Sequence, residues 1–318
     1  MSKFYHIILT HSAGSIPTYK LCRSASSITC VVIERVTMSA KLLEGKPIAE
    51  KIKEEIRKEI KTLGRKPVLA TIQVGENPQS TIYLKSQKKR AQELDIELQE
   101  HILLDSIAES ELINYIRKLN QDKNVTGILL QLPLPSQINS KNIPIHIDPL
   151  KDVEGMHPEN VGQAIFGKMR IGSCTALAVM ELINATGVDL YGKEAVIVGH
   201  SEIVGKPVSL LLLDKLATTT TCHIATGQRG YLPTHVKRAE ILVVAVGKPG
   251  IIHGEWVKEG AIVIDVGINR VNDKIVGDVE FEKAYERASY ITPVPGGVGP
   301  VTTIMLMRNL VESAKLQR

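Results

Sequence analysis

Short apolar runs alternate with helical patterns from Met38 onward, and this alternation limits the possible folds more than any other feature. The helical pattern is clearest where isoleucine recurs every fourth residue, as one face of an α-helix requires. Strands of a parallel sheet read as continuous apolar runs when helices cover both faces. The alternation therefore predicts an α/β fold with parallel sheets. The periodic isoleucines are Ile48, Ile52, Ile56 and Ile60.

The pattern restarts near residues 172–175, and at 318 residues the chain is long enough for about two domains. We expect two α/β domains flanking a cleft, the second a Rossmann-like, doubly wound parallel sheet. The predicted strands are 68–74, 97–104, 127–132, 195–199, 219–223, 241–246 and 261–266, and the predicted helices are 47–63, 79–94, 109–121, 176–186 and 301–315. The domains are predicted as 38–174, completed by the C-terminal segment 292–318, and 175–291.

Residues 1–37 do not share this pattern. They are poor in acidic residues and contain serine, which permits a targeting peptide, but they lack the apolar core of a signal peptide. We expect an extension outside the fold, and translation starting at Met38 is the simplest account. The extension contains four basic residues, Lys3, Lys20, Arg23 and Arg35, and one acidic residue, Glu34. Most of the net charge of +5 therefore belongs to the extension.

Composition then excludes several classes of function. The nearly neutral remainder and the 4% aromatic content argue against a nucleic-acid binder. No apolar run approaches the roughly 20 residues that a membrane span needs. The four cysteines show no CxxC or metal-ligand spacing, so we expect no metal and a reduced, cytoplasmic setting.

Several segments carry chemistry-bearing residues. The turn from Gly199 to Pro207 ends a strand and opens a helix, where backbone N–H groups can approach a phosphate, although a purely structural turn is about as plausible. Tyr83 and Gln87 share one helix face, which suits a polar heterocycle or simply solvent. Gln131 ends an apolar strand, where it either meets a ligand or is satisfied by backbone.

Two further loops are unusual. Residues 148–158 combine carboxylates with proline, glycine and His157, which suits either an amidine-like ligand edge or the capping of a turn. Residues 292–302 contain three glycines and three prolines, which indicates a ligand-clasping turn or a hinge between domains.

Taken in order, these segments resemble the methylenetetrahydrofolate dehydrogenase/methenyltetrahydrofolate cyclohydrolase family, the FolD type. The resemblance extends from Lys41 to the C-terminus. Its motifs are VGENPQSTIYLKSQKK, GILLQLPLP, DPLKDVEGMHPENVG, VIVGHSEIVGKP, VVAVGKPG, VIDVGINR and ITPVPGGVGPVT. It implies oxidation of 5,10-methylenetetrahydrofolate by hydride transfer to NAD or NADP, in a homodimer with folate on the first domain. Neither a nucleic acid nor a membrane is implied as a partner.

The resemblance also implies roles for individual residues. Four would act in catalysis: Tyr83, Gln87, Gln131 and Glu154. The folate would contact these four and also Leu130, Leu132, Pro295, Gly296, Gly297, Val298 and Gly299. The dinucleotide would contact Gly199, His200, Ser201, Ile203, Val204, Gly205, Val246, Gly247 and Ile268.

The chain departs from the family at two of these positions. The cyclohydrolase lysine is replaced by Gln87, which cannot be cationic or transfer a proton near neutral pH. Lys88 lies about 100° further around the helix and would not substitute for it. We therefore expect a dehydrogenase whose cyclohydrolase activity is lost or weak. Glu154 replaces the aspartate that faces the pterin.

Cofactor choice depends on the residues after two strands. His200 and Ile224 occupy positions where NADP-preferring members often place a cationic or polar residue, so we expect NAD. Two alternatives accompany this interpretation: a complete bifunctional dehydrogenase/cyclohydrolase, and a noncatalytic nucleotide-binding scaffold that has lost the folate pocket.

Overall fold

The computed structural model describes residues 19–22, 30–33, 39–75 and 78–318, and the side chains of residues 39–75 and 84–318. Strands β1 (Tyr19–Cys22) and β2 (Cys30–Ile33) pair with each other in antiparallel fashion. The rest of the predicted extension over residues 1–37 lies outside the described residues. In the part of the chain that the structure describes, no helix is long and apolar enough to cross a membrane.

The first sheet has three parallel strands in the order β5-β4-β6. β4 (Val68–Val74) is fully buried because it is the central strand, between β5 (Glu97–Leu103) and β6 (Gly127–Leu130). The predicted strand over 127–132 ends two residues early. Gln131 still donates its N–H to the Ile72 carbonyl, but Pro133 has no N–H with which to extend the pairing.

The second sheet has six parallel strands in the order β3-β13-β10-β9-β7-β8. Neighbouring residues of its strands point to opposite faces and enter different cores. In β7, Ile197 packs with α5 (Cys174–Ala185), α6 (Gly205–Asp214) and α10 (Val298–Leu316). Val196 packs with α8 (Leu232–Arg238) and α9 (Phe281–Tyr285). Helices thus cover both faces, which confirms the predicted doubly wound α/β fold. The strands are β3 (Lys41–Leu42), β7 (Glu194–Val198), β8 (Thr218–Cys222), β9 (Ile241–Val244), β10 (Ile262–Asp265) and β13 (Tyr290–Ile291).

The helices that the sequence predicts over 47–63, 79–94, 109–121, 176–186 and 301–315 begin and end close to those positions, and the other helices have no predicted bounds. α1 (Gly45–Ile60), α2 (Pro78–Glu93), α3 (Glu109–Gln121), α5 (Cys174–Ala185), α6 (Gly205–Asp214) and α10 (Val298–Leu316) form the larger set. The shorter elements are η1 (Pro144–His146), α4 (Pro158–Ile165), α7 (Ile224–Gln228), α8 (Leu232–Arg238), η2 (Gly254–Trp256), β11 (Asn269–Val271), β12 (Lys274–Val276) and α9 (Phe281–Tyr285).

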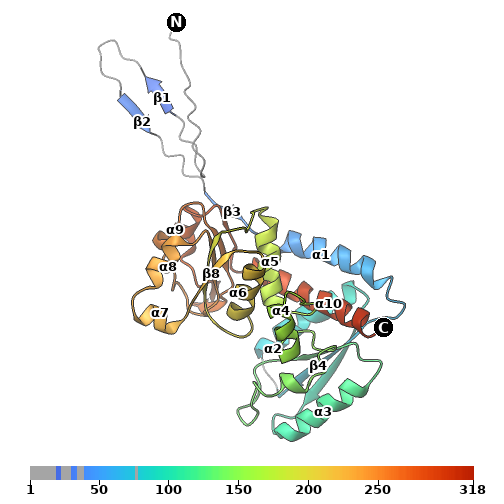
Figure 1. Ribbon diagram of the computed structural model, residues 1–318. Coiled ribbons are helices and arrows are strands. Elements are labelled where there is room, and N and C mark those ends of the chain that lie inside the picture. Colours follow the sequence, from blue (N-terminus) through green and yellow to red (C-terminus); the bar gives the residue numbers. More distant parts are fainter. Residues whose placement is uncertain (1–18, 23–29, 34–38, 76–77) are drawn as a thin grey trace.

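The last helix, α10, ties distant parts of the chain together. It lies against α1 and α5 (Figure 1), and all three contribute side chains to one apolar core. Ser313 near its end donates to the carbonyl of Thr126, directly before β6, over 2.7 Å. The core around α10 is therefore continuous between the two sheets.

Candidate functional site

The glycine turn after β7 has no room for side chains at its two glycines. Gly199 has φ of +121°, and a Cβ atom there would collide with the Ala245 carbonyl oxygen. A Cβ atom on Gly205 would collide with the carbonyl oxygen of Gly199 itself. Ser201 holds the turn closed, because its hydroxyl accepts the N–H of Val204 over 3.1 Å. The turn therefore leads directly into the N-terminus of α6, and helix N-termini after such turns are general binding sites for phosphate groups.

Other predicted cofactor residues lie around the same edge of the sheet. Val246 and Gly247 follow β9, and Ile268 follows the neighbouring β10. His200 follows β7, and its ring lies 5.5 Å from that of His223 after β8, measured between ring centroids. Parallel strands place their carboxyl ends together, and ligands of such sheets bind there. The residues predicted to bind a dinucleotide thus gather at this edge.

A hydrogen-bonded amide pair links the helix and the strand of the first sheet that carry predicted folate residues. Gln87 lies on α2 and Gln131 directly follows β6, and the Nε2 atom of Gln131 donates to Oε1 of Gln87 over 2.8 Å. Both side chains are buried. Leu130 is buried, and Leu132 is exposed. Tyr83 lies on α2, but its side chain is outside the described residues.

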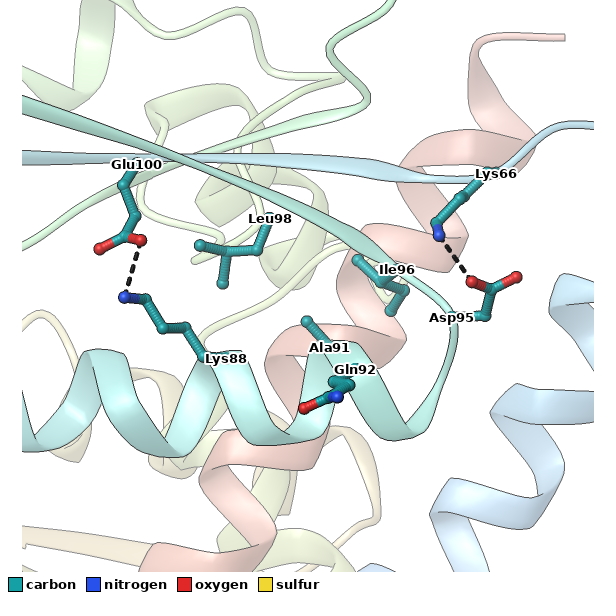
Figure 2. A pocket seen from close by; sticks show the side chains of 8 residues that line it. All are labelled: Lys66, Lys88, Ala91, Gln92, Asp95, Ile96, Leu98 and Glu100. Carbon is teal, nitrogen blue, oxygen red and sulfur yellow. Dashed lines mark hydrogen bonds and ion pairs between the residues drawn. The ribbon is translucent and has the colours of Figure 1, made fainter.

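Lys88 points away from this amide pair. Its ammonium forms an ion pair with Glu100 on β5 over 2.7 Å, and both side chains line a shallow surface groove (Figure 2). Ala91, Ile96 and Leu98 contribute apolar side chains to its lining. As the helical rotation predicts, Lys88 does not occupy the place of the cyclohydrolase lysine.

The loop after β6 contains two carboxyl groups, Asp152 and Glu154, that differ in hydrogen bonding and burial. Asp152 is buried and accepts three N–H groups, including the backbone N–H of His157 over 2.7 Å and the side chain of Asn160 over 3.0 Å. Glu154 is only partly accessible, and burial together with the charge of Asp152 raises its pKa to about 8. This shift favours the neutral carboxylic acid, the form of Glu154 that can donate a hydrogen bond.

A buried lysine fixes this loop to the end of α3. The ammonium of Lys151 donates to the carbonyls of Leu119, Asn120 and Asp122 over 3.0, 2.8 and 2.7 Å, at the end of α3. Burial lowers the pKa of Lys151. These three bonds satisfy carbonyls that have no partner within the helix. Asp152 and Glu154 are thus anchored by the residue that precedes them.

The predicted clasp forms a tight turn at the start of α10. Gly296 has φ of +110°, and its carbonyl accepts the N–H of Gly45 over 2.8 Å. A Cβ atom on Gly45 would collide with the carbonyl oxygen of Gly297. Pro295 lies in the same turn, whereas Val298, which is buried, and Gly299 are the first two residues of α10. The turn is therefore locked against the N-terminus of α1.

Two residues of this region were not predicted. For Gly45, the only sequence feature that could have indicated its role is its position two residues before Pro47. Asn309 is buried in α10 and donates to the carbonyls of Val153 and Gly172 over 2.8 and 2.7 Å. A lone amide in the apolar run of α10 was the available signal. Asn309 links the last helix to the loop that carries Glu154.

The structure thus brings Gln87 next to Gln131 and places the dinucleotide residues at one sheet edge. The catalytic and binding roles assigned to these residues stay predictions. Among the residues that the structure describes, no group of three or more histidine, cysteine or acidic side chains is placed to hold a metal ion.

Comparison with known families gives matches over both parts of the chain. Residues 43–154 match "Tetrahydrofolate dehydrogenase/cyclohydrolase, catalytic domain", and residues 173–318 match "Tetrahydrofolate dehydrogenase/cyclohydrolase, NAD(P)-binding domain". A similar curated relative is "Bifunctional protein FolD" of Acetivibrio thermocellus. It is 51% identical over 284 residues, which cover 88% of this chain and 99% of the relative.

This chain is also similar to solved structures of dehydrogenase/cyclohydrolase enzymes. The bifunctional enzyme FolD, methylenetetrahydrofolate dehydrogenase/cyclohydrolase, from Campylobacter jejuni is 45% identical with a TM-score of 0.84, covering 88% of this chain and 100% of the other. The methylenetetrahydrofolate dehydrogenase-cyclohydrolase (FolD) of Trypanosoma brucei, complexed with NADP cofactor and inhibitor, is 37% identical with a TM-score of 0.83. That match covers 88% of this chain and 98% of the other.

Proposed function

Because the chain belongs to the tetrahydrofolate dehydrogenase/cyclohydrolase family, we propose that it oxidises 5,10-methylenetetrahydrofolate to 5,10-methenyltetrahydrofolate with NAD(P). The observation that carries this proposal is the glycine turn from Gly199 to Gly205. Its close backbone packing leaves no room for a Cβ atom, as expected of a dinucleotide-binding turn. A noncatalytic scaffold would not need the buried Gln87–Gln131 pair and the locked clasp that accompany this turn.

The main task of the protein in this reaction is to orient two carbon atoms. Bound NAD(P) supplies the nicotinamide carbon that accepts the hydride. The turn at Gly199 and Ser201 and the start of α6 would hold the phosphates of the dinucleotide, and Ile268 would lie near its nicotinamide. Gln131, Glu154 and the clasp from Pro295 to Gly299 hold the folate, whose own nitrogens carry the positive charge of the product. No general base of the chain is then required, and the rate depends on alignment.

The comparisons favour the bifunctional alternative for the second activity. The relatives from Acetivibrio thermocellus and Campylobacter jejuni are both named bifunctional, and the family is named for dehydrogenase and cyclohydrolase together. The cyclohydrolase loss expected from the sequence has no support among these relatives. We therefore take a bifunctional enzyme as the first candidate.

One observation keeps a dehydrogenase with little or no cyclohydrolase activity as the second candidate. The position of the cyclohydrolase lysine is filled by Gln87, a neutral amide already bonded to Gln131. An amide supplies neither a cation nor a transferable proton near neutral pH. Lys88 is engaged by Glu100 and faces away.

For the cofactor, we propose a preference for NAD, and for the assembly, a homodimer in the cytoplasm. His200 and Ile224 offer no permanent cation to a 2′-phosphate. Both Cys174 and Cys222 are free, buried thiols, which suits a reducing compartment.

The test measures each half-reaction of the purified chain with both cofactors. Folate-dependent formation of reduced nicotinamide supports the dehydrogenase, and its absence with both NAD and NADP would refute the proposal. Hydrolysis of methenyltetrahydrofolate at a rate comparable to the dehydrogenase supports the first candidate, and hydrolysis at the uncatalysed rate supports the second. A large NADP preference in kcat/KM would reject the choice of NAD.

A further inference from the structure

A buried carboxylate lies beneath the loop that follows β9. Asp278 is completely buried. Its Oδ2 atom accepts the N–H groups of Val246 and Gly247 over 2.7 and 2.9 Å, and its Oδ1 atom accepts the N–H of Lys248 over 2.9 Å. The side chain of Asn269 donates to Oδ1 as well, over 2.8 Å. One carboxylate therefore fixes three consecutive residues, two of which are predicted to contact the dinucleotide.

A second buried carboxylate holds Asp278 and the neighbouring loop in place. Asp265 ends β10 and accepts the N–H groups of Gly267 and Asp278, both over 3.0 Å, and that of Val279 over 2.9 Å. Packing here is close, because a Cβ atom on Gly267 would collide with the carboxylate of Asp278. Gly267 directly precedes Ile268. The two aspartates thus connect both loops that flank the predicted nicotinamide end of the site.

The direction of these hydrogen bonds decides what the loop after β9 can bind. Successive backbone N–H groups that converge on one point form a concave anion site, which in nucleotide-binding proteins often receives a phosphate. Here a protein carboxylate fills that site, so Val246, Gly247 and Lys248 have no inward N–H group left for a phosphate. Four donors around one carboxylate also make the position of the loop rigid.

We propose that Asp278 is a positioning residue for the nicotinamide cofactor, because its carboxylate sets the conformation in which residues 246–248 receive the nicotinamide end. This inference rests on the proposed function and goes beyond it. A merely structural carboxylate would contribute to stability without affecting cofactor affinity. A positioning carboxylate acts on affinity for the cofactor and leaves affinity for the folate unchanged.

Asp278→Asn tests this directly. An amide in this place always turns an NH2 group toward two existing donors, either Val246 and Gly247 or Lys248 and Asn269. The double variant with Asn269→Asp relieves the second case, since the new carboxylate accepts from the amide introduced at position 278 and restores the charge. Glu240→Gln is the matched control, because Glu240 also accepts a backbone N–H, from Glu194 over 3.1 Å, but lies at the opposite end of β9.

Two measurements need no turnover: the Kd for NAD and NADP by calorimetry, and amide hydrogen exchange of residues 246–248 in the cofactor-free protein. For Asp278→Asn we expect a Kd about tenfold weaker and faster exchange within residues 246–248, because two of the four donors lose their acceptor and each lost bond weakens the Kd about threefold. The double variant should recover part of this affinity, and the Glu240→Gln control should stay within about twofold of the unmodified chain. In turnover, the KM for the cofactor should rise while the KM for the folate stays constant.

Unchanged cofactor Kd in Asp278→Asn, or an equal loss in Glu240→Gln, would overturn the inference. If the Asp278→Asn variant does not fold, the Kd for the cofactor is measured for Asn269→Ala instead. We expect it to weaken the Kd about threefold through one lost bond, and an unchanged Kd would overturn the inference. Failure of the unmodified chain to bind either NAD or NADP would instead refute the proposed function, so the two failures are distinguishable.

Discussion

The side-chain amide of Gln131 donates to that of Gln87 over 2.8 Å, and both residues are buried between α2 and the end of β6. Each amide thereby satisfies part of the other's hydrogen-bonding capacity without any charge. A lysine at position 87 would bring an ammonium into the same place. The residue type at position 87 therefore determines whether a cation lies beside Gln131.

On the second candidate function, a dehydrogenase with little cyclohydrolase activity, Gln87→Lys should raise cyclohydrolase activity by at least about tenfold, because a positioned proton-transfer group contributes roughly 10²-fold or more. The Gln131 amide can rotate to present its oxygen to the new ammonium. Dehydrogenase activity should change by less than about threefold, because hydride transfer needs no proton transfer at this position. Hydrolysis of methenyltetrahydrofolate, followed by absorbance, measures the effect.

Gln87→Met is the matched control, since it keeps the length of the side chain and adds no charge. It should leave hydrolysis at the level of the unmodified chain. Substantial hydrolysis by the unmodified chain itself would show that Gln87 suffices and would contradict this prediction.

Glu154 should make stability depend on pH. Its folded-state pKa of about 8 lies above the ordinary value of 4.5, because burial disfavours the charged form. Between these two pKa values the folded state binds the proton more tightly than the unfolded state. Stability therefore falls as pH rises through this window.

Glu154→Gln removes that dependence. As pH rises from below to above this window, the free energy of unfolding of the variant should increase by roughly 2 kcal/mol relative to that of the unmodified chain. This is less than the full pKa shift implies, because the side chain of Glu154 is partly accessible. Urea denaturation of both proteins at each pH measures the difference. A difference that stays constant with pH would show that Glu154 is already ionised at neutral pH.

Gly205→Ala should weaken the cofactor interaction by at least about tenfold in kcat/KM, because the new methyl group meets the backbone carbonyl of Gly199. Gly227→Ala in α7 is the control, since no atom lies within 4 Å of its added Cβ. The KM values for cofactor and folate are measured separately. Equal kinetics in the two variants would exclude the turn from cofactor binding.

Lys151→Met should destabilise the protein by about 3 kcal/mol, because three carbonyls at the end of α3 lose a charged donor. Lys118→Met in the last turn of the same helix is exposed and should cost less than about 0.5 kcal/mol. Chemical denaturation measures both. A loss below about 1 kcal/mol in Lys151→Met would mean that water replaces the ammonium there.

Elements with a strong period were predictable from the sequence. The predicted strand over 68–74 and the predicted helix over 109–121 match β4 and α3, because an apolar run and an amphipathic period each act within one element. The α/β fold with a doubly wound sheet and the family are confirmed. Leu132 was placed in a strand, although the prolines that follow it end the pairing earlier.

Features that depend on distant partners were not predictable. β3 has only two residues and exists because β13 pairs with it. Asp278 looks like an ordinary loop acid in the sequence, and only the fold places four N–H donors around it. The contact between Gln87 and Gln131 joins residues from two elements, so the sequence suggested each residue separately but not the bond between them.

The pairing of β3 with β13 has a consequence for synthesis on the ribosome. Lys41 lies opposite Tyr290, so this edge of the large sheet joins the beginning of the described fold to a segment made near its end. Because the chain is synthesised from its N-terminus, β3 can pair with β13 only after almost the entire polypeptide has been made. The three-stranded sheet is complete by Leu130 and can form first. The nascent chain therefore carries a temporarily unpaired strand, which nascent-chain proteolysis would detect as late protection of residues 39–44.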